Sequence, residues 1–300
     1  METRAHLTIF IGEIGARTER LTLAIVGCGN MGSAILSGLL DATRSDPHPR
    51  ISRFIVVTKT AESVDRLRSH FKQEESRIEL VHGKTVWAMQ EADIILLGCK
   101  PHVAQDILSA EGVEEALAGK FLISFLAGKT PQVLESYISR TDDASPRPYV
   151  VRAMPNVAAR IRKSMTIVEH NPSLPDELSD TLRWIFEQIG SVKVLASELF
   201  DIGSLLVGSS MAILTVGLDG LLDGCVMEGL RRPEALEMAA QSMLGLAEML
   251  RQGECTPAEY RENVSSPKGG TITALLTVEK AAVRGTFAQS IIDGTKKIQG

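Results

Sequence analysis

Residues 21–40 read LTLAIVGCGNMGSAILSGLL, and this stretch decides the fold. The apolar run Leu23–Val26 predicts a buried strand, and the apolar residues that follow Gly32 recur at the spacing of a helix. Three glycines separate the two elements at G-x-G-x-x-G spacing, namely Gly27, Gly29 and Gly32. A strand, a glycine turn and a helix in this order are typical of a dinucleotide-binding fold.

Each glycine of this motif is expected to have its own task. Gly27 permits the tight turn out of the strand, and Gly29 lets the backbone approach a pyrophosphate that a Cβ atom would hit. Gly32 lets the helix pack close to the strand, and the helix then directs its free N–H groups at the phosphates. The same spacing also occurs in ordinary turns, so the flanking strand and helix carry the assignment.

The composition indicates a soluble protein with room for two domains. The chain has 300 residues, of which 44% are hydrophobic and 23% charged, and its formal net charge of -5 disfavours a nucleic-acid binder. The cysteines Cys28, Cys99, Cys225 and Cys255 are scattered, and neither they nor the histidines show metal-ligand spacing. Reduced thiols in a cytoplasmic protein fit this pattern better than a disulfide framework.

Residues 1–20 are interpreted as a leading extension of unknown role. Their apolar patch Leu7–Ile11 is short and Glu2, Glu13 and Glu19 lie among the arginines, so the segment does not resemble a signal or transit peptide. No segment reaches the uninterrupted apolar length that a membrane span needs. The uncharged stretch Leu205–Leu218 is also too short, and predicts a helix buried in a bundle or a dimer interface.

Strand and helix patterns alternate from residue 21 to residue 196. Further strands are expected at 54–57, 78–81, 93–98, 121–125 and 149–153, then an edge strand at 164–168 and a last strand at 192–195. A helix from Pro175 to Ile189 is expected to stop at Gly190. From Glu198 onward only helical patterns remain. The sequence therefore predicts an α/β, Rossmann-like doubly wound sheet followed by an all-α C-terminal domain.

The ends of the expected strands supply candidate cofactor contacts. Thr58-Lys59-Thr60 follows the second strand, where NAD-binding proteins tend to place a carboxylate for the ribose 2′-hydroxyl. A cation with two hydroxyls suits a 2′-phosphate instead, which favours NADPH over NADH. Lys100 of Cys99-Lys100-Pro101 and the amide of Asn156 follow two other strands at the same edge. A solvated surface lysine is the alternative for both Lys59 and Lys100.

A second glycine loop lies at Asn263–Ile272, with the sequence NVSSPKGGTI. Its serines, proline and glycines lead directly into a helix that is expected to begin near Thr271. Such a loop presents several N–H groups at a helix N-terminus, which forms an anion site, and the natural anion here is a substrate carboxylate. A plain loop before a capped helix is the alternative.

These stretches together resemble the pyrroline-5-carboxylate reductase family. The resemblance runs from about residue 21 to the C-terminus and rests on Ala24–Gly32, Gly98–Pro101, Val151–Asn156, Asn263–Pro267 with Gly269–Ile272, and Glu279–Gly285. It implies a Rossmann domain over 21–196 and a helical domain over 197–300 that forms a homodimer or a higher homo-oligomer. It also implies NAD(P)H and reduction of the cyclic imine 1-pyrroline-5-carboxylate to L-proline; with the lysine after the second strand, NADPH is expected, with NADH possible.

The resemblance assigns roles to individual residues. The cofactor residues expected from the glycine motif and the strand ends, which the resemblance leaves intact, are Gly27, Gly29, Asn30, Met31, Gly32, Thr58, Lys59, Cys99, Lys100, Pro101 and Asn156. The substrate carboxylate is expected on the loop that contains Ser265, Ser266, Lys268, Gly269 and Gly270, and the ring nitrogen on the hydroxyl of Thr271, the residue expected to act in catalysis. No metal, nucleic acid or membrane is expected as a partner.

Two departures from the family pattern touch the expected substrate site. Val207–Ile213 lacks a glycine, a proline and an aromatic residue of the family, so we expect a more regular helix with a bulkier wall. Lys268 places a Cβ atom and a charge where the family has glycine. A six-membered piperideine carboxylate is therefore an alternative substrate, and a non-catalytic NADPH-binding protein an alternative role. A hydroxyacid dehydrogenase shares only the first glycine motif and ranks lower.

Overall fold

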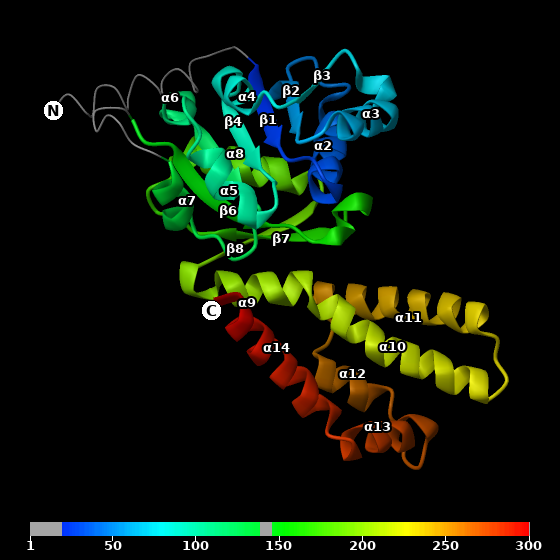
Figure 1. Cartoon of the computed structure of the whole chain (residues 1–300). Coiled ribbons are helices and arrows are strands. Elements are labelled where there is room, and N and C mark those ends of the chain that lie inside the picture. Colours follow the sequence, from blue (N-terminus) through cyan, green and yellow to red (C-terminus); the bar gives the residue numbers. More distant parts are fainter. Residues whose placement is uncertain (1–19, 139–145, 300) are drawn as a thin grey trace. The chain divides into compact units, whose positions relative to one another are not determined.

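The computed structural model describes residues 20–138 and 146–299 (Figure 1). The chain divides into two compact units, the first extending to Gly208 and the second from Ser209 to Ile298. The leading extension expected over residues 1–20 lies outside the described residues except for Arg20.

The first unit is an α/β domain in which strands and helices alternate. Its strands are β1 (Leu21–Val26), β2 (Ile51–Thr58), β3 (Ile78–His82), β4 (Ile94–Leu97), β5 (Phe121–Ser124), β6 (Tyr149–Met154), β7 (Ser164–Glu169) and β8 (Gly190–Leu195). Its helices are α2 (Asn30–Thr43), α3 (Ala61–His70), η1 (Lys72–Glu74), α4 (Thr85–Glu91), η2 (Pro101–Val103), α5 (Ala104–Leu108), α6 (Val113–Leu117), α7 (Pro131–Tyr137), η3 (Val157–Ile161), α8 (Asp176–Glu187) and α9 (Ser197–Gly208).

The strand order places the expected cofactor loops together. The sheet runs β3-β2-β1-β4-β5-β6-β7-β8, and β1 to β6 are parallel. Val26 at the end of β1 pairs with Val57 of β2 and with Leu97 of β4, so the loops after these three strands begin side by side. The chain reverses its direction of winding between β1 and β4, and this reversal is where doubly wound sheets bind their ligands. The predicted fold is confirmed.

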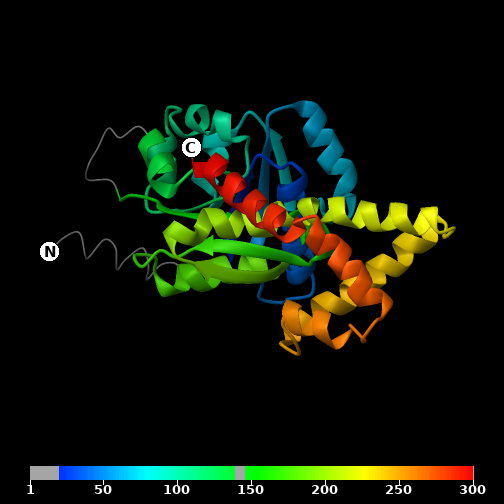
Figure 2. The same cartoon turned by 90° about the horizontal axis from the view of Figure 1, so that it is seen from below.

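Helices cover both faces of this sheet, and each face has its own core (Figures 1 and 2). Leu23 and Ile25 of β1 point to the face covered by α2 and α8, where residues of both helices join them. Val26 belongs to the opposite core, with residues of α4, α5, α6 and α7. Every residue of β4 and β5 is buried, as expected of strands covered on both sides.

Two expectations about the last strands are wrong. β7 is an inner strand, because β8 pairs parallel with it and takes the edge position, while β7 itself is antiparallel to β6. Gly190 does not stop the preceding helix, which ends at Glu187, but opens β8 with φ +151. A Cβ atom at Gly190 would lie 2.0 Å from the carbonyl oxygen of Ser164, so the close strand pairing requires a glycine there.

The second unit is entirely helical in the described residues. It consists of α10 (Ser210–Met227), α11 (Arg232–Gln252), α12 (Pro257–Asn263), α13 (Gly270–Lys280) and α14 (Val283–Gln299). Helices α10 and α11 form an antiparallel pair joined by a short loop (Figure 1). Gly253, at φ +75, ends α11 in the left-handed conformation that favours glycine.

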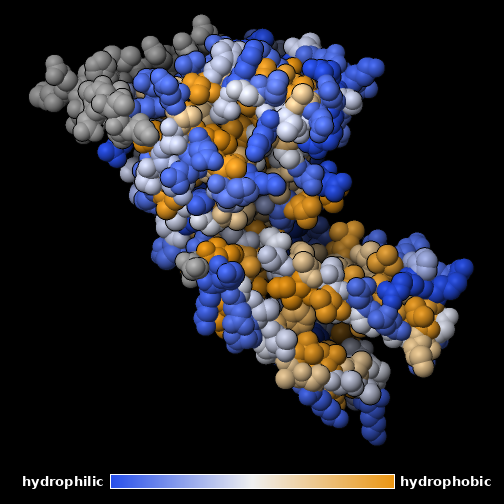
Figure 3. Space-filling view, viewed as in Figure 1, coloured by the Kyte–Doolittle hydropathy of each residue, from blue (hydrophilic) through white to orange (hydrophobic). Residues whose placement is uncertain are grey.

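This helical unit has almost no interior of its own. Among its described apolar residues only Leu222 and Ala235 are buried, whereas Val216 is 74% and Met227 87% exposed. Figure 3 shows apolar side chains gathered on the surface of these helices. A helical unit with its apolar side chains on the surface requires another apolar surface to cover them.

The chain from α9 into α10 is longer and more apolar than we expected. Ser197–Met227 spans 31 residues, and its most apolar window has a mean hydropathy of 1.8, which suffices for a membrane span by length and composition. The expectation that no segment reaches this length is therefore wrong on this measure, although helices of soluble proteins also meet it. The expected regular helix over 207–213 is likewise wrong, because a turn at Ser209 separates α9 from α10.

Candidate functional site

The first glycine loop has the backbone geometry of a phosphate cradle. Gly27 adopts φ +89, and a Cβ atom there would lie 2.6 Å from the backbone nitrogen of Cys99. A Cβ atom on Gly32 would lie 3.3 Å from the carbonyl oxygen of Gly27, which is tight packing of α2 against the loop. A Cβ atom on Gly29 would meet nothing within 4 Å, so the loop faces open space at this residue.

Helix α2 begins directly beyond this open space. Gly29 is its N-cap and bonds the N–H of Ser33 through its carbonyl oxygen, 2.9 Å away. The first turn includes Asn30 and Met31. Its backbone N–H groups have no partner within the helix and point beyond the N-terminal end of α2. Asn30 is exposed, whereas Met31 is half-buried and packs against the core. Open space at Gly29 in front of a helix N-terminus fits a dinucleotide pyrophosphate.

The loop after β2 presents one exposed cation beside a set of hydroxyls. Thr58 is buried and donates its hydroxyl to the carbonyl oxygen of Thr60, 2.9 Å away. Thr60 caps α3, since its Oγ1 atom accepts the N–H of Ser63 at 3.3 Å. Lys59 is exposed between them. Of the two residues predicted to contact the cofactor here, Lys59 is therefore the accessible one.

Sequence reasoning missed a second cation at this loop. Arg66 of α3 reaches back to the first glycine loop, where its Nη2 atom donates to the carbonyl oxygen of Cys28 at 3.4 Å. No spacing rule marks this residue, because an arginine on an exposed helix face is ordinarily solvated. The contact between the Arg66 side chain and the neighbouring loop is what identifies this residue, and that contact is visible only in the structure.

The loop after β4 carries Cys99, Lys100 and Pro101, three predicted cofactor residues. Lys100 is exposed and is the N-cap of η2, and Pro101 occupies the first turn, as expected.

Burial raises the pKa of the Cys99 thiol to about 11. Burial also raises the pKa of Cys28 in the first glycine loop to about 11, against smaller opposing effects of Ser33 and Arg66. Neither thiol is thus an ionised nucleophile at neutral pH.

Asn156, the predicted cofactor residue after β6, has both polar ends of its side chain engaged. Its Oδ1 atom accepts the N–H of Ala158 at 3.1 Å and caps η3. Its Nδ2 atom donates to the carbonyl oxygen of Val207 at 3.0 Å. Because a turn follows at Ser209, that carbonyl lies at a helix end, where carbonyl oxygens need outside donors. The structure thus gives Asn156 a structural task.

Arg152, in the same motif, is held in a buried ion network. Its Nε atom donates to Glu169 at 2.6 Å and its Nη1 atom to Asp201 at 3.0 Å, and its guanidinium lies 4.0 Å from the ring centre of Phe200. Arg152 is only 5% exposed. It ties β6 to β7 and α9, and its buried position keeps it from a ligand at the surface.

The second glycine loop places its residues in a tight turn before α13. Ser266 accepts the N–H of Gly269 at 3.0 Å through its carbonyl oxygen, and Ser265 donates its hydroxyl to the carbonyl oxygen of Arg261 at 2.7 Å. Lys268 adopts φ +60, the left-handed conformation that favours glycine. A Cβ atom on Gly269 would lie 2.4 Å from the Oγ atom of Ser266.

The start of α13 is accessible. Gly269 is its N-cap, and Gly270 and Thr271 form its exposed first turn. The expectation of a helix beginning near Thr271 is confirmed. Gly269 turns its carbonyl oxygen inward, where it accepts both the N–H and the hydroxyl of Thr273. The loop thus exposes N–H groups and the Thr271 side chain together.

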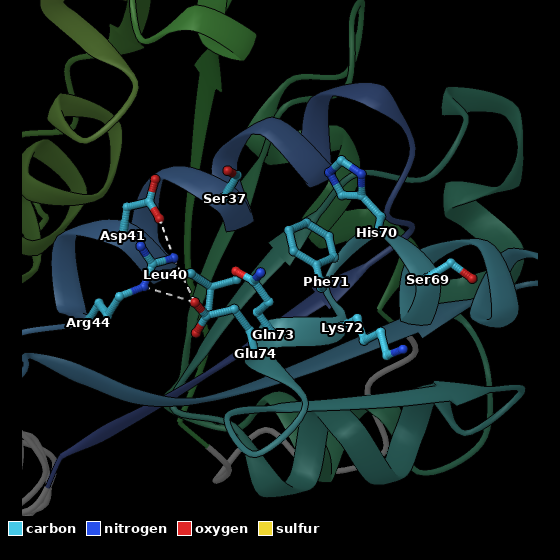
Figure 4. A pocket seen from close by; sticks show the side chains of 10 residues that line it. All are labelled: Ser37, Leu40, Asp41, Arg44, Ser69, His70, Phe71, Lys72, Gln73 and Glu74. Atoms are coloured by element: carbon cyan, nitrogen blue, oxygen red, sulfur yellow. Dashed lines mark hydrogen bonds and ion pairs between the residues drawn. The ribbon is translucent and has the colours of Figure 1, made fainter.

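A hollow of about 420 Å³ lies elsewhere on the first unit, between α2 and the end of α3 (Figure 4). Its acidic side chains, Asp41 and Glu74, both pair with Arg44 at 2.7 Å. None of the predicted site residues lines it. Within residues 20–138 and 146–299, no three acidic, histidine or cysteine side chains are grouped as metal ligands.

Curated relatives cover nearly the whole chain. The chain is 39% identical over 307 residues to pyrroline-5-carboxylate reductase of Neurospora crassa, covering 93% of this chain and 92% of the relative. It is 37% identical to the enzyme of that name from Lophium arboricola, with 92% of each covered, and 35% identical to that of Schizosaccharomyces pombe, with 92% of this chain and 97% of the relative covered. The chain belongs to the pyrroline-5-carboxylate reductase family.

A family model agrees with this membership, and solved structures share the fold. Residues 197–300 match the model for pyrroline-5-carboxylate reductase dimerisation, and residues 22–128 match the model described as NADP oxidoreductase, coenzyme F420-dependent. The 1-pyrroline-5-carboxylate reductase of Streptococcus pyogenes shares the fold with a TM-score of 0.78 at 24% identity, covering 93% of this chain and 98% of that one. A Plasmodium falciparum pyrroline carboxylate reductase with NADP bound shares it with a TM-score of 0.76 at 21% identity, covering 94% and 98%.

Proposed function

We propose that this chain reduces 1-pyrroline-5-carboxylate to L-proline with NADPH. The observation that carries the proposal is identity of 35% to 39% with three pyrroline-5-carboxylate reductases over more than nine-tenths of the chain. The open cradle at Gly29, in front of the N-terminus of α2, supports a dinucleotide as the cofactor. When bound, NADPH would supply the hydride that adds to the electrophilic carbon of the protonated imine.

The substrate side of the proposal rests on the second glycine loop. We infer that the backbone N–H groups around Ser266, Gly269 and Gly270 bind the substrate carboxylate, with Lys268 adding a charge-assisted contact. Thr271 would hold the ring nitrogen through its hydroxyl. These groups fix the position of the ring, so the contribution of the protein is mainly proximity and orientation.

On the cofactor side, NADPH is favoured over NADH by the loop after β2. Lys59 is exposed there, and neither Lys59 nor Thr60 of this loop is a carboxylate that would accept a ribose 2′-hydroxyl; the next carboxylate is Glu62, in the first turn of α3. We propose the remaining cofactor contacts at Lys100, at Pro101, at Cys99 and at the first turn of α2, which contains Asn30 and Met31. Asn156 would contribute through the second N–H or the second lone pair of its amide, because its two structural bonds use only one of each.

We further propose that the chain works as a homodimer or higher homo-oligomer in the cytoplasm. A second copy would cover the apolar side chains that the helical unit leaves exposed, such as Val216 and Met227. The four cysteines are unpaired, which fits a reducing compartment, and cell fractionation tests this location. The proposed domain bounds are 21–196 and 197–300, with residues 1–20 as an extension.

The test is NADPH oxidation with pyrroline-5-carboxylate, by the unaltered chain and two threonine variants. Thr271→Val should lower kcat/KM about 10- to 100-fold, the effect of losing a hydrogen bond to a charged group. Thr277→Val is the matched control, because Thr277 is an exposed threonine of the same helix, and it should leave the rate unchanged. No turnover by the unaltered chain, or equal loss in both variants, would reject the proposal.

A six-membered cyclic imine acid is the second candidate substrate. The observation that favours it is the exposed Lys268 at φ +60, which changes the expected carboxylate loop. Turnover of piperideine carboxylate alone would replace the proline proposal. Binding of NADPH without turnover of either imine would instead indicate a non-catalytic role.

A further inference from the structure

The Arg66 side chain spans the space between the loops after β1 and β2. It starts from the second turn of α3, the helix that follows Lys59 and Thr60, and its Nη2 atom reaches the carbonyl oxygen of Cys28 in the first glycine loop. The two loops are neighbours, because the N–H of Gly27 donates to the carbonyl oxygen of Val57 at 2.9 Å. Arg66 therefore lies where the adenosine half of a dinucleotide crosses from one loop to the other.

The guanidinium of Arg66 has little to hold it there. A guanidinium carries five N–H donors. Within the described residues, the guanidinium of Arg66 forms one hydrogen bond, the 3.4 Å bond to the carbonyl oxygen of Cys28. Asp65, the neighbouring carboxylate, pairs instead with Arg68 at 2.7 Å. Within the described part of the chain, no carboxylate lies within ion-pair distance of Arg66. An exposed arginine without a carboxylate partner keeps its donors available for an anion.

A second cation and two hydroxyls lie at the start of the helix that carries Arg66. Lys59 lies directly before the N-cap of α3, and Thr60 donates its hydroxyl to the Oγ atom of Ser63 at 3.1 Å. Ser63 and Arg66 are three positions apart on one helix, so they share a face. Lys59, Ser63 and Arg66 thus place two positive charges and a hydroxyl beside the end of β2, where the adenosine ribose binds in this fold. The first turn of α3 also carries the carboxylate of Glu62, for which the described residues show no ion pair with either cation.

We propose that Arg66 is a specificity residue that binds the 2′-phosphate of the cofactor adenosine together with Lys59. The inference rests on the proposed use of NADPH and adds a residue to that site. Lys59 reaches the phosphate from the loop and Arg66 from the helix, so the phosphate lies between two cations. The planar fork of the guanidinium can donate two parallel hydrogen bonds to one phosphate, which a lysine cannot do.

The test compares two fragments of the cofactor that differ only in the 2′-phosphate, namely 2′,5′-ADP and 5′-ADP. Calorimetry measures the Kd of each for the full-length chain, for Arg66→Gln and for Arg68→Gln. Arg68→Gln removes the same charge from an exposed position of the same helix and is the matched control. Thermal unfolding of all three proteins shows whether the fold is retained.

Arg66→Gln should weaken binding of 2′,5′-ADP at least tenfold and leave the Kd of 5′-ADP within about threefold, while Arg68→Gln changes neither. In turnover, the KM for NADPH should rise while that for NADH stays. An equal loss of both fragments would overturn the proposal and place Arg66 on the pyrophosphate. Unchanged binding of 2′,5′-ADP would overturn it outright.

The same data separate this inference from the proposed function. If the unaltered chain binds 2′,5′-ADP no better than 5′-ADP, the preference for NADPH itself is wrong, and the role of Arg66 fails with it. If the unaltered chain prefers 2′,5′-ADP and Arg66→Gln keeps that preference, only the role of Arg66 is wrong. Lys59→Gln then shows whether the loop lysine accounts for the whole effect.

Discussion

Gly27 and Gly29 are two residues apart, yet their alanine variants should behave in opposite ways. Gly27→Ala puts a side chain at φ +89 and within 2.6 Å of the backbone of Cys99, so it should destabilise the fold by at least about 2 kcal/mol. Gly29→Ala places its methyl group in open space and should change stability by less than about 1 kcal/mol. It should nevertheless weaken NADPH binding tenfold or more, because the methyl group occupies the cradle.

Urea unfolding and calorimetric titration with NADPH measure the two effects separately. Normal NADPH binding by a well-folded Gly29→Ala variant would contradict a pyrophosphate at this loop. Normal stability of Gly27→Ala would contradict the close approach of the loops after β1 and β4.

Thr166 offers a second test at a single residue. Its Oγ1 atom is fully buried in β7 and has no hydrogen-bond partner among the described residues. Replacing the hydroxyl with a methyl group of similar size removes an unpaired polar atom, so Thr166→Val should stabilise the fold by about 1 kcal/mol. The midpoint of urea unfolding measures this gain.

Thr43→Val is the matched control for that experiment. Thr43 is also buried, but its hydroxyl donates to the carbonyl oxygen of Leu39 at 2.6 Å and accepts from Arg77. The same substitution should destabilise the fold here, because it leaves the arginine donor unpaired. Equal effects at both positions would contradict the role given to hydrogen bonding.

Helix α12 begins with a capping box whose strength depends on pH. Thr256 bonds the N–H of Glu259 through its Oγ1 atom, and the Glu259 carboxylate accepts the N–H of Thr256 at 2.7 Å. These bonds favour the charged carboxylate and hold the pKa of Glu259 below its usual value of 4.5. The folded pKa is the lower one, so this stabilisation is present above pH 4.5 and is lost as the pH falls through the folded pKa.

The measurement is urea unfolding of the unaltered chain and of Glu259→Gln at pH 7 and at pH 3. Glu259→Gln should be less stable at pH 7, and the difference should shrink toward pH 3, because the stabilisation by the charged carboxylate decreases as the pH falls below 4.5. Glu262→Gln removes a charge from an exposed position of the same helix without touching the cap. If both variants show the same pH dependence, the capping box is not its source.

Local patterns predicted most of these elements, and the failures share a cause. The strand before Gly27 and the helix after it follow from apolar spacing, which is a property of neighbouring residues. The inner position of β7 depends on pairing with β8, some 20 residues later, and spacing within β7 does not reveal it. The break at Ser209 is likewise accompanied by a bond from Asn156, which is distant in sequence. Both features, the inner position of β7 and the break at Ser209, involve contacts between residues that are distant in sequence.

At the scale of the whole molecule, the exposed helices predict assembly. If a second copy covers the helical unit, the melting temperature should rise with protein concentration, because association stabilises only the folded state. Val216→Asp, at a side chain that is 74% exposed in the single chain, should lower the assembly state and remove that dependence. Sedimentation equilibrium and thermal unfolding at several concentrations measure both.

Val133→Asp is the control for this prediction. It makes the same change at an exposed valine of α7, in the α/β unit, and should leave assembly unchanged. A monomeric protein whose melting temperature does not change with protein concentration would contradict the proposed homo-oligomer. A loss of assembly in both variants would point to general destabilisation instead.

The sequence predicted only part of the candidate site. The glycine loops and the cations after β2 and β4 follow from motifs, because parallel strands bring their carboxyl ends to one edge. Arg66 lies outside every motif, and only the path of its side chain to Cys28 reveals it. The roles of Ser265 to Thr271 and the domain bounds at 196 and 197 remain predictions.

The two protonated thiols near the glycine loop make the chain selective toward labelling reagents. Maleimides react with the thiolate, and a thiol of pKa about 11 is ionised in only about one molecule in 10,000 at pH 7. Cys225 and Cys255 lie in the helical unit and are half-buried. A maleimide fluorophore that reacts with the chain at neutral pH is therefore expected on the helical unit, while Cys28 and Cys99 stay unmodified. The unlabelled loop would then let spectroscopy follow the helices during turnover without a cysteine-free variant.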